Sequence, residues 1–108
     1  MNKITNQSEL EALIQEQSMC LVFIKTENCG VCDVVLDKTN RLMTKYPQID
    51  SLLVYMHENP DVSSAYLVFT APTILLFIEG KEVYRASRFV VMGELEDTIR
   101  MWYEQIFS

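Results

Sequence analysis

Two cysteines separated by two residues, Cys29 and Cys32, are the side chains of this sequence best suited to chemistry. They stand between a predicted strand and a predicted helix, where the free N–H groups and the positive end of the helix dipole favour a thiolate at Cys29. A thiolate with a lowered pKa is a nucleophile at neutral pH. The pattern therefore predicts thiol–disulfide exchange, in which Cys29 attacks a substrate disulfide and Cys32 releases the product.

Two other interpretations of the pair are a zinc site and a pair of inert core cysteines. Zinc requires four ligands, and only Cys20 and His57 remain, on other predicted elements and without ligand spacing, so we expect no metal. Free cysteines often pack in cores, but a strand–helix junction faces solvent, which disfavours inert burial of the pair. Cys20, at the start of a predicted strand, is itself expected to be a buried small hydrophobic residue.

Length and composition predict one domain over residues 1–108. The chain is 49% hydrophobic and 22% charged, as in globular proteins. A formal net charge of −6 without a basic stretch argues against a nucleic-acid partner, and a solvated acidic surface is ordinary in bacterial-type soluble proteins. No apolar run reaches the roughly 20 residues of a membrane helix, and residues 1–17 lack the apolar block of a signal peptide. We therefore expect a cytoplasmic protein with no membrane partner.

Apolar periodicity and turn signals predict eight elements along the chain. Ser8 and Glu11 have the spacing of a capping box, Asn59 is a candidate cap with Pro60 at the first helical position, and Gly80 lies in a hairpin turn. The order of elements predicts an α/β fold with a mixed four-stranded sheet and helices on both faces. The predicted helices span 8–18, 30–46, a short segment from 60, and 93–107, and the predicted strands span 19–25, 51–56, 73–78 and 82–87.

Further motifs extend the pattern beyond the cysteine pair. The segment 57–61 (His-Glu-Asn-Pro-Asp), the segment 71–73 (Ala-Pro-Thr) before an apolar strand, and Gly80 follow the pair at characteristic distances. With these motifs the chain resembles the thioredoxin family over essentially its whole length, as a thioredoxin-like protein with a Cys-Gly-Val-Cys motif. The resemblance implies a thioredoxin-like fold. It also implies that Pro72 is a cis-proline facing the disulfide, where substrate backbone pairs beside Ala71.

The resemblance also defines a substrate groove around the cysteines. Its expected members are Asn28, Gly30, Val31, Ala71, Pro72 and Arg88. Asn28 and Val31 stand where thioredoxins usually have tryptophan and proline. Such replacements alter the stability of the dithiol relative to the disulfide. A change of 30 mV in reduction potential corresponds to about 1.4 kcal/mol, so modest changes could reverse the preferred direction of exchange, which the sequence leaves open.

Two further departures concern proton transfer. Phe23 stands where the family has a buried acid, and Leu53 stands where it has the lysine partner of that acid. Without these groups, Glu27 and His57 are the local candidates for moving a proton, although a lone histidine after a strand is commonly a surface residue. Lys25 and Glu27 flank the site and would either tune the pKa of Cys29 in opposite directions or remain solvated.

Arg88 falls where family members commonly carry glycine near the substrate groove. A cation there would steer an anionic substrate or stabilise the Cys29 thiolate. Alternatively, Arg88 is a rim residue whose stem lies on Phe89. The sequence leaves both interpretations open.

Together these features predict a thiol–disulfide oxidoreductase without a cofactor, acting as a cytoplasmic reductant of disulfide-containing proteins. A thioredoxin reductase is the electron donor that the resemblance implies. The alternative is a binding or redox-sensing module that keeps the fold as a scaffold, which the missing acid–lysine pair favours. Retention of both cysteines and of Pro72 favours the enzyme. No glutathione-site pattern supports a glutaredoxin-like function.

Overall fold

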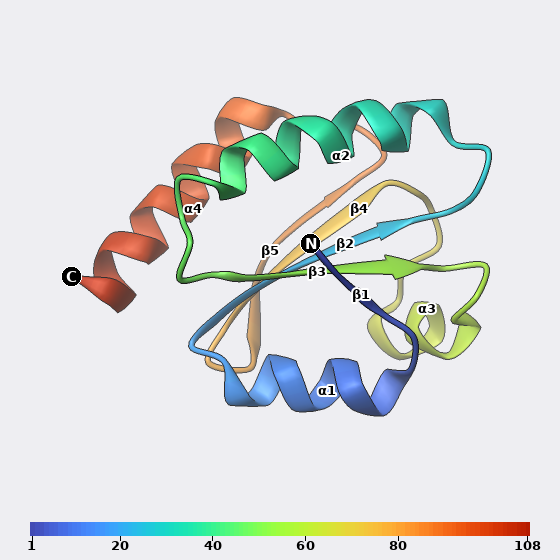
Figure 1. Cartoon of the computed structure of the whole chain (residues 1–108), viewed down its shortest axis with the longest axis horizontal. Coiled ribbons are helices and arrows are strands. Elements are labelled where there is room, and N and C mark those ends of the chain that lie inside the picture. Colours follow the sequence, from blue (N-terminus) through green and yellow to red (C-terminus); the bar gives the residue numbers. More distant parts are fainter.

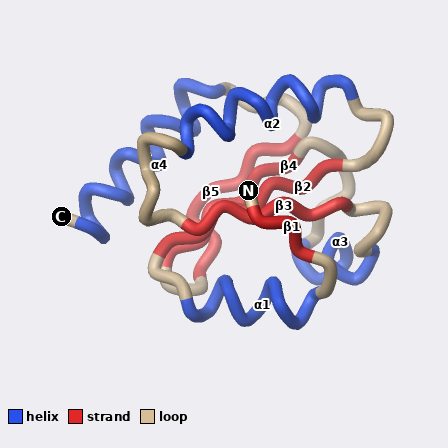
Figure 2. Tube along the Cα trace, in the orientation of Figure 1, coloured by secondary structure: helices blue, strands red, loops and turns tan.

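The structure, a computed structural model that describes residues 1–108, has a twisted sheet between two layers of helices (Figure 1). Helices α2 and α4 cover one face of this sheet, and α1 and α3 cover the other (Figure 2). In chain order the elements are β1 (Asn2–Ile4), α1 (Gln7–Glu16), β2 (Met19–Lys25), α2 (Gly30–Met43), β3 (Asp50–Tyr55), α3 (Pro60–Tyr66), β4 (Thr73–Ile78), β5 (Lys81–Ser87) and α4 (Met92–Phe107).

The strands follow the order β1-β3-β2-β4-β5, so β2 lies at the centre of the sheet. Strands β1 and β2 both run parallel to β3. Strand β4 runs antiparallel to β2, and β5 forms an antiparallel hairpin with β4. The mixed sheet with helices on both faces is confirmed, but the predicted number of four strands is wrong because β1 adds a fifth.

Strand β1 was not predicted because it is too short to show an alternation of apolar and polar residues. Its three residues pair with β3, with Asn2 opposite Leu52 and Ile4 opposite Val54. Only Ile4 is buried, where it joins the core beneath α1. A single apolar residue provides no periodic signal, so only pairing with a strand far along the chain defines this edge of the sheet.

Helix α1 begins one residue earlier than predicted, and its cap is a different residue. The Asn6 side chain accepts a hydrogen bond of 2.8 Å from the Glu9 N–H, so the predicted capping box of Ser8 and Glu11 is wrong. Asn6 and Ser8 are both good capping residues, and each is followed three residues later by a glutamate. The short connection from β1 therefore determines which of the two begins the helix.

Two other helix ends also differ from prediction. Helix α2 ends at Met43, because the backbone from Thr44 to Tyr46 tightens into i to i+3 turns before Pro47. Helix α3 has Pro60 at its first position, as predicted. Asn59 precedes it but forms no side-chain cap, because its amide instead donates to the Tyr55 carbonyl at 3.0 Å.

The central strand β2 is buried on both faces. Cys20, Val22 and Ile24 point into the core beneath α1 and α3, and the alternating Leu21 and Phe23 point into the core beneath α2 and α4. Such a strand appears as a continuous apolar run, which is why its boundaries could be predicted. No helix of the structure is both long and apolar enough to cross a membrane.

We expect Ile4→Ala to lower the free energy of unfolding by about 3 kcal/mol, because it removes a buried side chain and leaves a cavity. Asn2→Ala, on the same strand but exposed, should change it by less than about 0.5 kcal/mol. Urea unfolding of the oxidised protein measures both. A loss for Ile4→Ala as small as that for Asn2→Ala would show that β1 does not belong to the folded sheet.

Candidate active site

The cysteine pair lies at the junction between β2 and α2, as predicted. Cys29 and Cys32 form a disulfide with their Cα atoms 5.2 Å apart. Asn28 adopts a left-handed backbone (φ 56°) just before the pair, a conformation that asparagine tolerates better than most residues. This turn leads the chain from the end of the sheet into the first turn of α2.

Cys29 is the N-cap of α2. Its Sγ accepts a hydrogen bond of 3.2 Å from the Cys32 N–H, one of the N–H groups that the helix itself leaves without a partner. The free N–H groups and the positive dipole end of a helix N-terminus favour a negatively charged group at this position. The structure thus places Cys29 at the N-terminus of the helix that follows β2, which is the position predicted from the sequence.

The two sulfur-bearing residues differ in access to solvent. Cys29 is half-buried, whereas Cys32 is completely buried in the first turn of α2. Gly30 and Val31 between them are exposed, and Val31 retains 60% of its accessible surface. Of the two cysteines, only Cys29 is therefore in contact with solvent.

The sheet brings Pro72 and Arg88 to the same end as the cysteine loop. Thr73 pairs with Ile24 on β2 and with Ser87 on β5, so the residues just beyond this row adjoin one another. The Ala71–Pro72 peptide is cis, as the resemblance implied, and the Arg88 N–H donates to the Pro72 carbonyl at 2.7 Å. In Figure 1 the loop that leaves β5 and the start of α2 lie at this common end.

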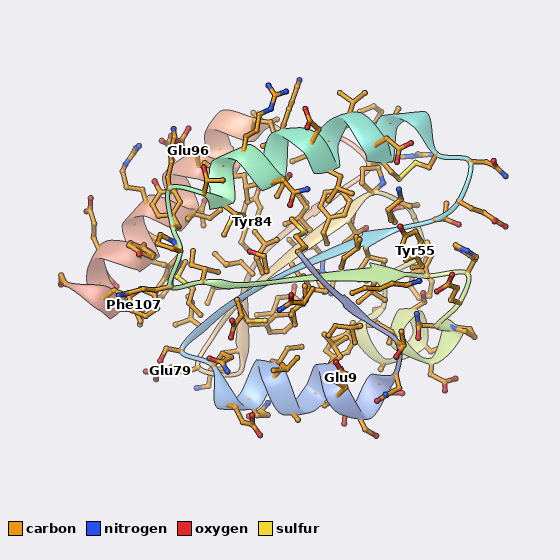
Figure 3. The ribbon with its side chains drawn as sticks, viewed as in Figure 1. Glu9, Tyr55, Glu79, Tyr84, Glu96 and Phe107 are labelled. Carbon is orange, nitrogen blue, oxygen red and sulfur yellow. A yellow bond between two sulfur atoms is a disulfide. The ribbon has the colours of Figure 1, made fainter.

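An ion pair that the sequence analysis missed connects β2 to α2. The Lys25 ammonium lies 2.5 Å from the Asp33 carboxylate, and the lysine side chain is only 11% exposed. Lys25 also lies 5.4 Å from the ring centroid of Tyr55, which stands at the end of β3 (Figure 3). The two partners are eight residues apart on different elements, so no local pattern could reveal the pair. Lys25 is thus compensated by a carboxylate beside the redox loop.

The two predicted proton-transfer candidates lie together on the loops after β2 and β3. His57 Nε2 is 3.8 Å from carboxylate oxygens of both Glu27 and Glu58, and its Nδ1 is 3.5 Å from the Thr26 hydroxyl. No hydrogen bond or ion pair joins this group to either cysteine. The geometry therefore provides no direct proton path from His57 or Glu27 to Cys32.

Phe23 and Leu53, which replace the acid and lysine of the family, are directly paired across β2 and β3. Phe23 is completely buried and Leu53 packs against the same core beneath α2. An apolar contact therefore occupies the place of a buried charged pair. Because neither side chain ionises, this part of the core cannot accept a proton from a cysteine.

Cys20 lies in β2 away from the active site and is completely buried, as predicted. Burial, with a smaller effect from the nearby Asp50 carboxylate, raises the pKa of Cys20 to about 12. The thiol therefore stays protonated at physiological pH.

Nowhere do three His, Cys, Asp or Glu side chains come together in a way that could hold a metal ion.

Several large apolar side chains are exposed on α2 and on the loops before β4 and after β5. Val31 on α2, Phe69 before Pro72 and Phe89 after β5 are strongly exposed, the last two by 74% and 82%. The one hollow of the structure, of about 280 Å³, lies between the second half of α2 and the start of α4, where it is lined by Lys38, Arg41, Leu42, Lys45, Met92 and Glu96. Neither Cys29 nor Cys32 lines this hollow.

Comparison with known proteins agrees with this geometry. A sequence model of the thioredoxin family matches residues 1–101. The chain belongs to the thioredoxin family. It is similar to the thioredoxin-like protein YdfQ of Bacillus subtilis, with 30% identity over 94 residues that cover 87% of this chain and 84% of that protein. It is also similar to thioredoxin-1 of Saccharomyces cerevisiae, with 32% identity over 76 residues, 70% of this chain and 74% of that one.

The thioredoxin-like fold is equally clear from solved structures. The X-ray structure of Fasciola hepatica thioredoxin matches with a TM-score of 0.85 at 27% identity, covering 94% of this chain and 98% of that chain. Family membership and the Cys29–Cys32 pair identify the protein as a thiol–disulfide oxidoreductase of thioredoxin type. Thioredoxin-family proteins act on disulfide substrates and are in turn reduced by reductases.

We expect the thiol of Cys20 to resist alkylation in the folded protein, because it is buried and its pKa of about 12 leaves almost no thiolate at pH 8. A Cys29→Ser/Cys32→Ser variant isolates this thiol. Iodoacetamide should label it only after denaturant is added, as mass spectrometry would show. Rapid labelling without denaturant would mean that the central strand opens readily.

Proposed function

We propose that this protein is a disulfide reductase in which Cys29 is the nucleophile and Cys32 the resolving thiol. The observation that carries the proposal is the asymmetry of the pair. Cys29 is accessible and accepts a helix N-terminal N–H, whereas Cys32 is completely buried behind it. Only the first sulfur can reach a disulfide on another protein, and the second can reach only the first.

The reaction follows from thiolate exchange. The Cys29 thiolate attacks one sulfur of the substrate disulfide, forming a mixed disulfide and releasing the other sulfur as a thiolate. The Cys32 thiolate then attacks Cys29 Sγ, which releases the second substrate thiolate and forms the Cys29–Cys32 disulfide. Two electrons pass to the substrate, and a two-electron donor must restore the dithiol before the next cycle.

The substrate groove in this proposal consists of the residues predicted for it. Asn28, Gly30 and Val31 surround the accessible sulfur, and Ala71, Pro72 and Arg88 form the neighbouring edge, linked by the bond from the Arg88 N–H to the Pro72 carbonyl. The cis peptide before Pro72 supports this role, as does the exposed apolar surface on both sides. An extended segment of a disulfide-containing protein is the ligand that this surface fits.

The setting of the reaction is part of the same proposal. Residues 1–108 act as one domain, in the cytoplasm, where a thioredoxin reductase would supply the electrons. The family relationship supports this electron donor, and the lack of a spanning helix is compatible with the location.

The Phe23–Leu53 contact favours a second candidate, a thioredoxin-fold binding or redox-sensing module. With no buried acid at that place, the resolving thiol lacks a proton acceptor there and turnover would be slow. Such a module would bind its partner on the same apolar surface without repeated exchange. Turnover of a disulfide substrate separates the two functions.

Insulin disulfide reduction with dithiothreitol as donor tests the assignment of the two cysteines. We expect Cys29→Ser to abolish turnover, because it removes the only accessible sulfur. Cys32→Ser should instead accumulate a mixed disulfide with the substrate, visible on non-reducing gels. Cys20→Ala serves as the matched control and should keep the activity of the original protein. Activity that survives in Cys29→Ser, or absence of turnover in the unmodified protein, would contradict the proposal and favour the module.

The reduction potential of the Cys29–Cys32 couple tests the direction of exchange. For a reductase we expect a reversible two-electron couple near the value of about −270 mV known for thioredoxin. Equilibration in glutathione and dithiothreitol buffers, followed by thiol labelling, measures it. A value near about −180 mV or higher would indicate an isomerase or an oxidant instead.

A further inference from the structure

We propose that Arg88 determines substrate specificity by binding a carboxylate close to the disulfide that is reduced. The proposal rests on the function proposed above and adds a substrate class to it. The preferred substrates are disulfides flanked by a carboxylate, supplied either by an acidic side chain beside the substrate cysteine or by the glutathione of a mixed disulfide.

The backbone of Arg88 is the first observation. Its φ of 70° lies in the left-handed region, which glycine enters freely and arginine does not. The turn is tightly defined, with the Arg88 N–H bonded to the Pro72 carbonyl and the Phe89 N–H bonded to the Ser87 carbonyl, both at 2.7 Å. An arginine where glycine would fit without strain, beside the proposed substrate groove, motivates the hypothesis that its side chain has a role there.

The charge of Arg88 is the second observation. The side chain is exposed and forms no ion pair and no hydrogen bond, although the chain as a whole carries a net charge of −6. Each of the other three arginines pairs with a carboxylate on its own element. These pairs are Arg41–Asp37 at 3.1 Å, Arg85–Glu82 at 2.8 Å and Arg100–Asp97 at 2.6 Å. Arg88 is thus the one guanidinium left free for a ligand.

The position of Arg88 is the third observation. It adjoins Pro72 at the end of the sheet from which the cysteine loop leaves, and Lys25, the other cation near that loop, is already bound to Asp33. The strongly exposed Phe89 follows it directly. A guanidinium presents paired N–H donors that match both oxygens of a carboxylate, so the preferred ligand is a carboxylate held beside apolar groups.

Two matched pairs of probes test the proposal, with dithiothreitol as reductant and kcat/KM as the measurement. The first pair consists of peptide disulfides that differ only by glutamate or glutamine next to the cysteine. The second is the glutamine peptide in mixed disulfide with glutathione or with cysteamine, which lacks carboxylates. We expect the unmodified protein to prefer the carboxylate in at least one pair by about threefold to tenfold, as for a charge-assisted hydrogen bond at an exposed site.

In Arg88→Gly and Arg88→Gln the two probes of each pair should react at nearly equal rates. In the unmodified protein the preference should weaken as the salt concentration rises, as it does for exposed charge pairs. Arg41→Gln, which removes an exposed arginine elsewhere, should retain it. Arg88→Gly accommodates the left-handed backbone without penalty, so loss of folding is not expected to obscure the result.

A preference in the first pair assigns the carboxylate to the substrate polypeptide, and one in the second pair assigns it to glutathione. Equal rates within both pairs, or a preference that persists in Arg88→Gly, would overturn the role of Arg88 while leaving the reductase intact. Absence of turnover with every probe would instead overturn the proposed function itself.

Discussion

The burial of β2 on both faces is the constraint on which the rest of the active site depends. A strand packed between two cores and hydrogen-bonded to β3 and β4 cannot shift without opening both cores. The cysteine loop leaves directly from its end, and the Lys25–Asp33 pair ties the first turn of α2 back to that end. The position of the cysteine loop is therefore determined by a strand that both cores hold in place.

The two cysteines of the loop differ in their position relative to α2. A residue at the N-cap is both accessible and able to accept a helix N–H, whereas a residue three positions later lies in the first turn and faces the core. The spacing of the pair thus leaves Cys29 half-buried at the surface and Cys32 completely buried. The cis-Pro72 edge and the Arg88 turn lie at the same end of the sheet as the cysteine loop because β4 begins beside the end of β2 and β5 ends beside the start of β4.

The Phe23–Leu53 contact stabilises the core by apolar packing, whereas the charged pair usual in the family would do so by electrostatic attraction. Burying an ion pair costs several kcal/mol of desolvation per ion, which the attraction between the charges offsets only with good geometry. Apolar packing at this place avoids that cost and fills the core beneath α2. The consequence is that proton exchange at Cys32 depends on water or on groups outside this part of the core.

Sequence alone determined the features that repeat locally: the buried runs 19–25 and 73–78, the hairpin at Gly80, and a cysteine pair opening a helix. These could be predicted because period, burial and turn chemistry all leave signals within a few residues. The cap at Asn6, the strand β1, the Lys25–Asp33 pair and the free guanidinium of Arg88 were decided only by tertiary structure. The cap depends on where the connection from β1 enters the helix, because two local candidates were equally good. The strand and the ion pair join residues on different elements, and such a pairing has no local period to reveal it.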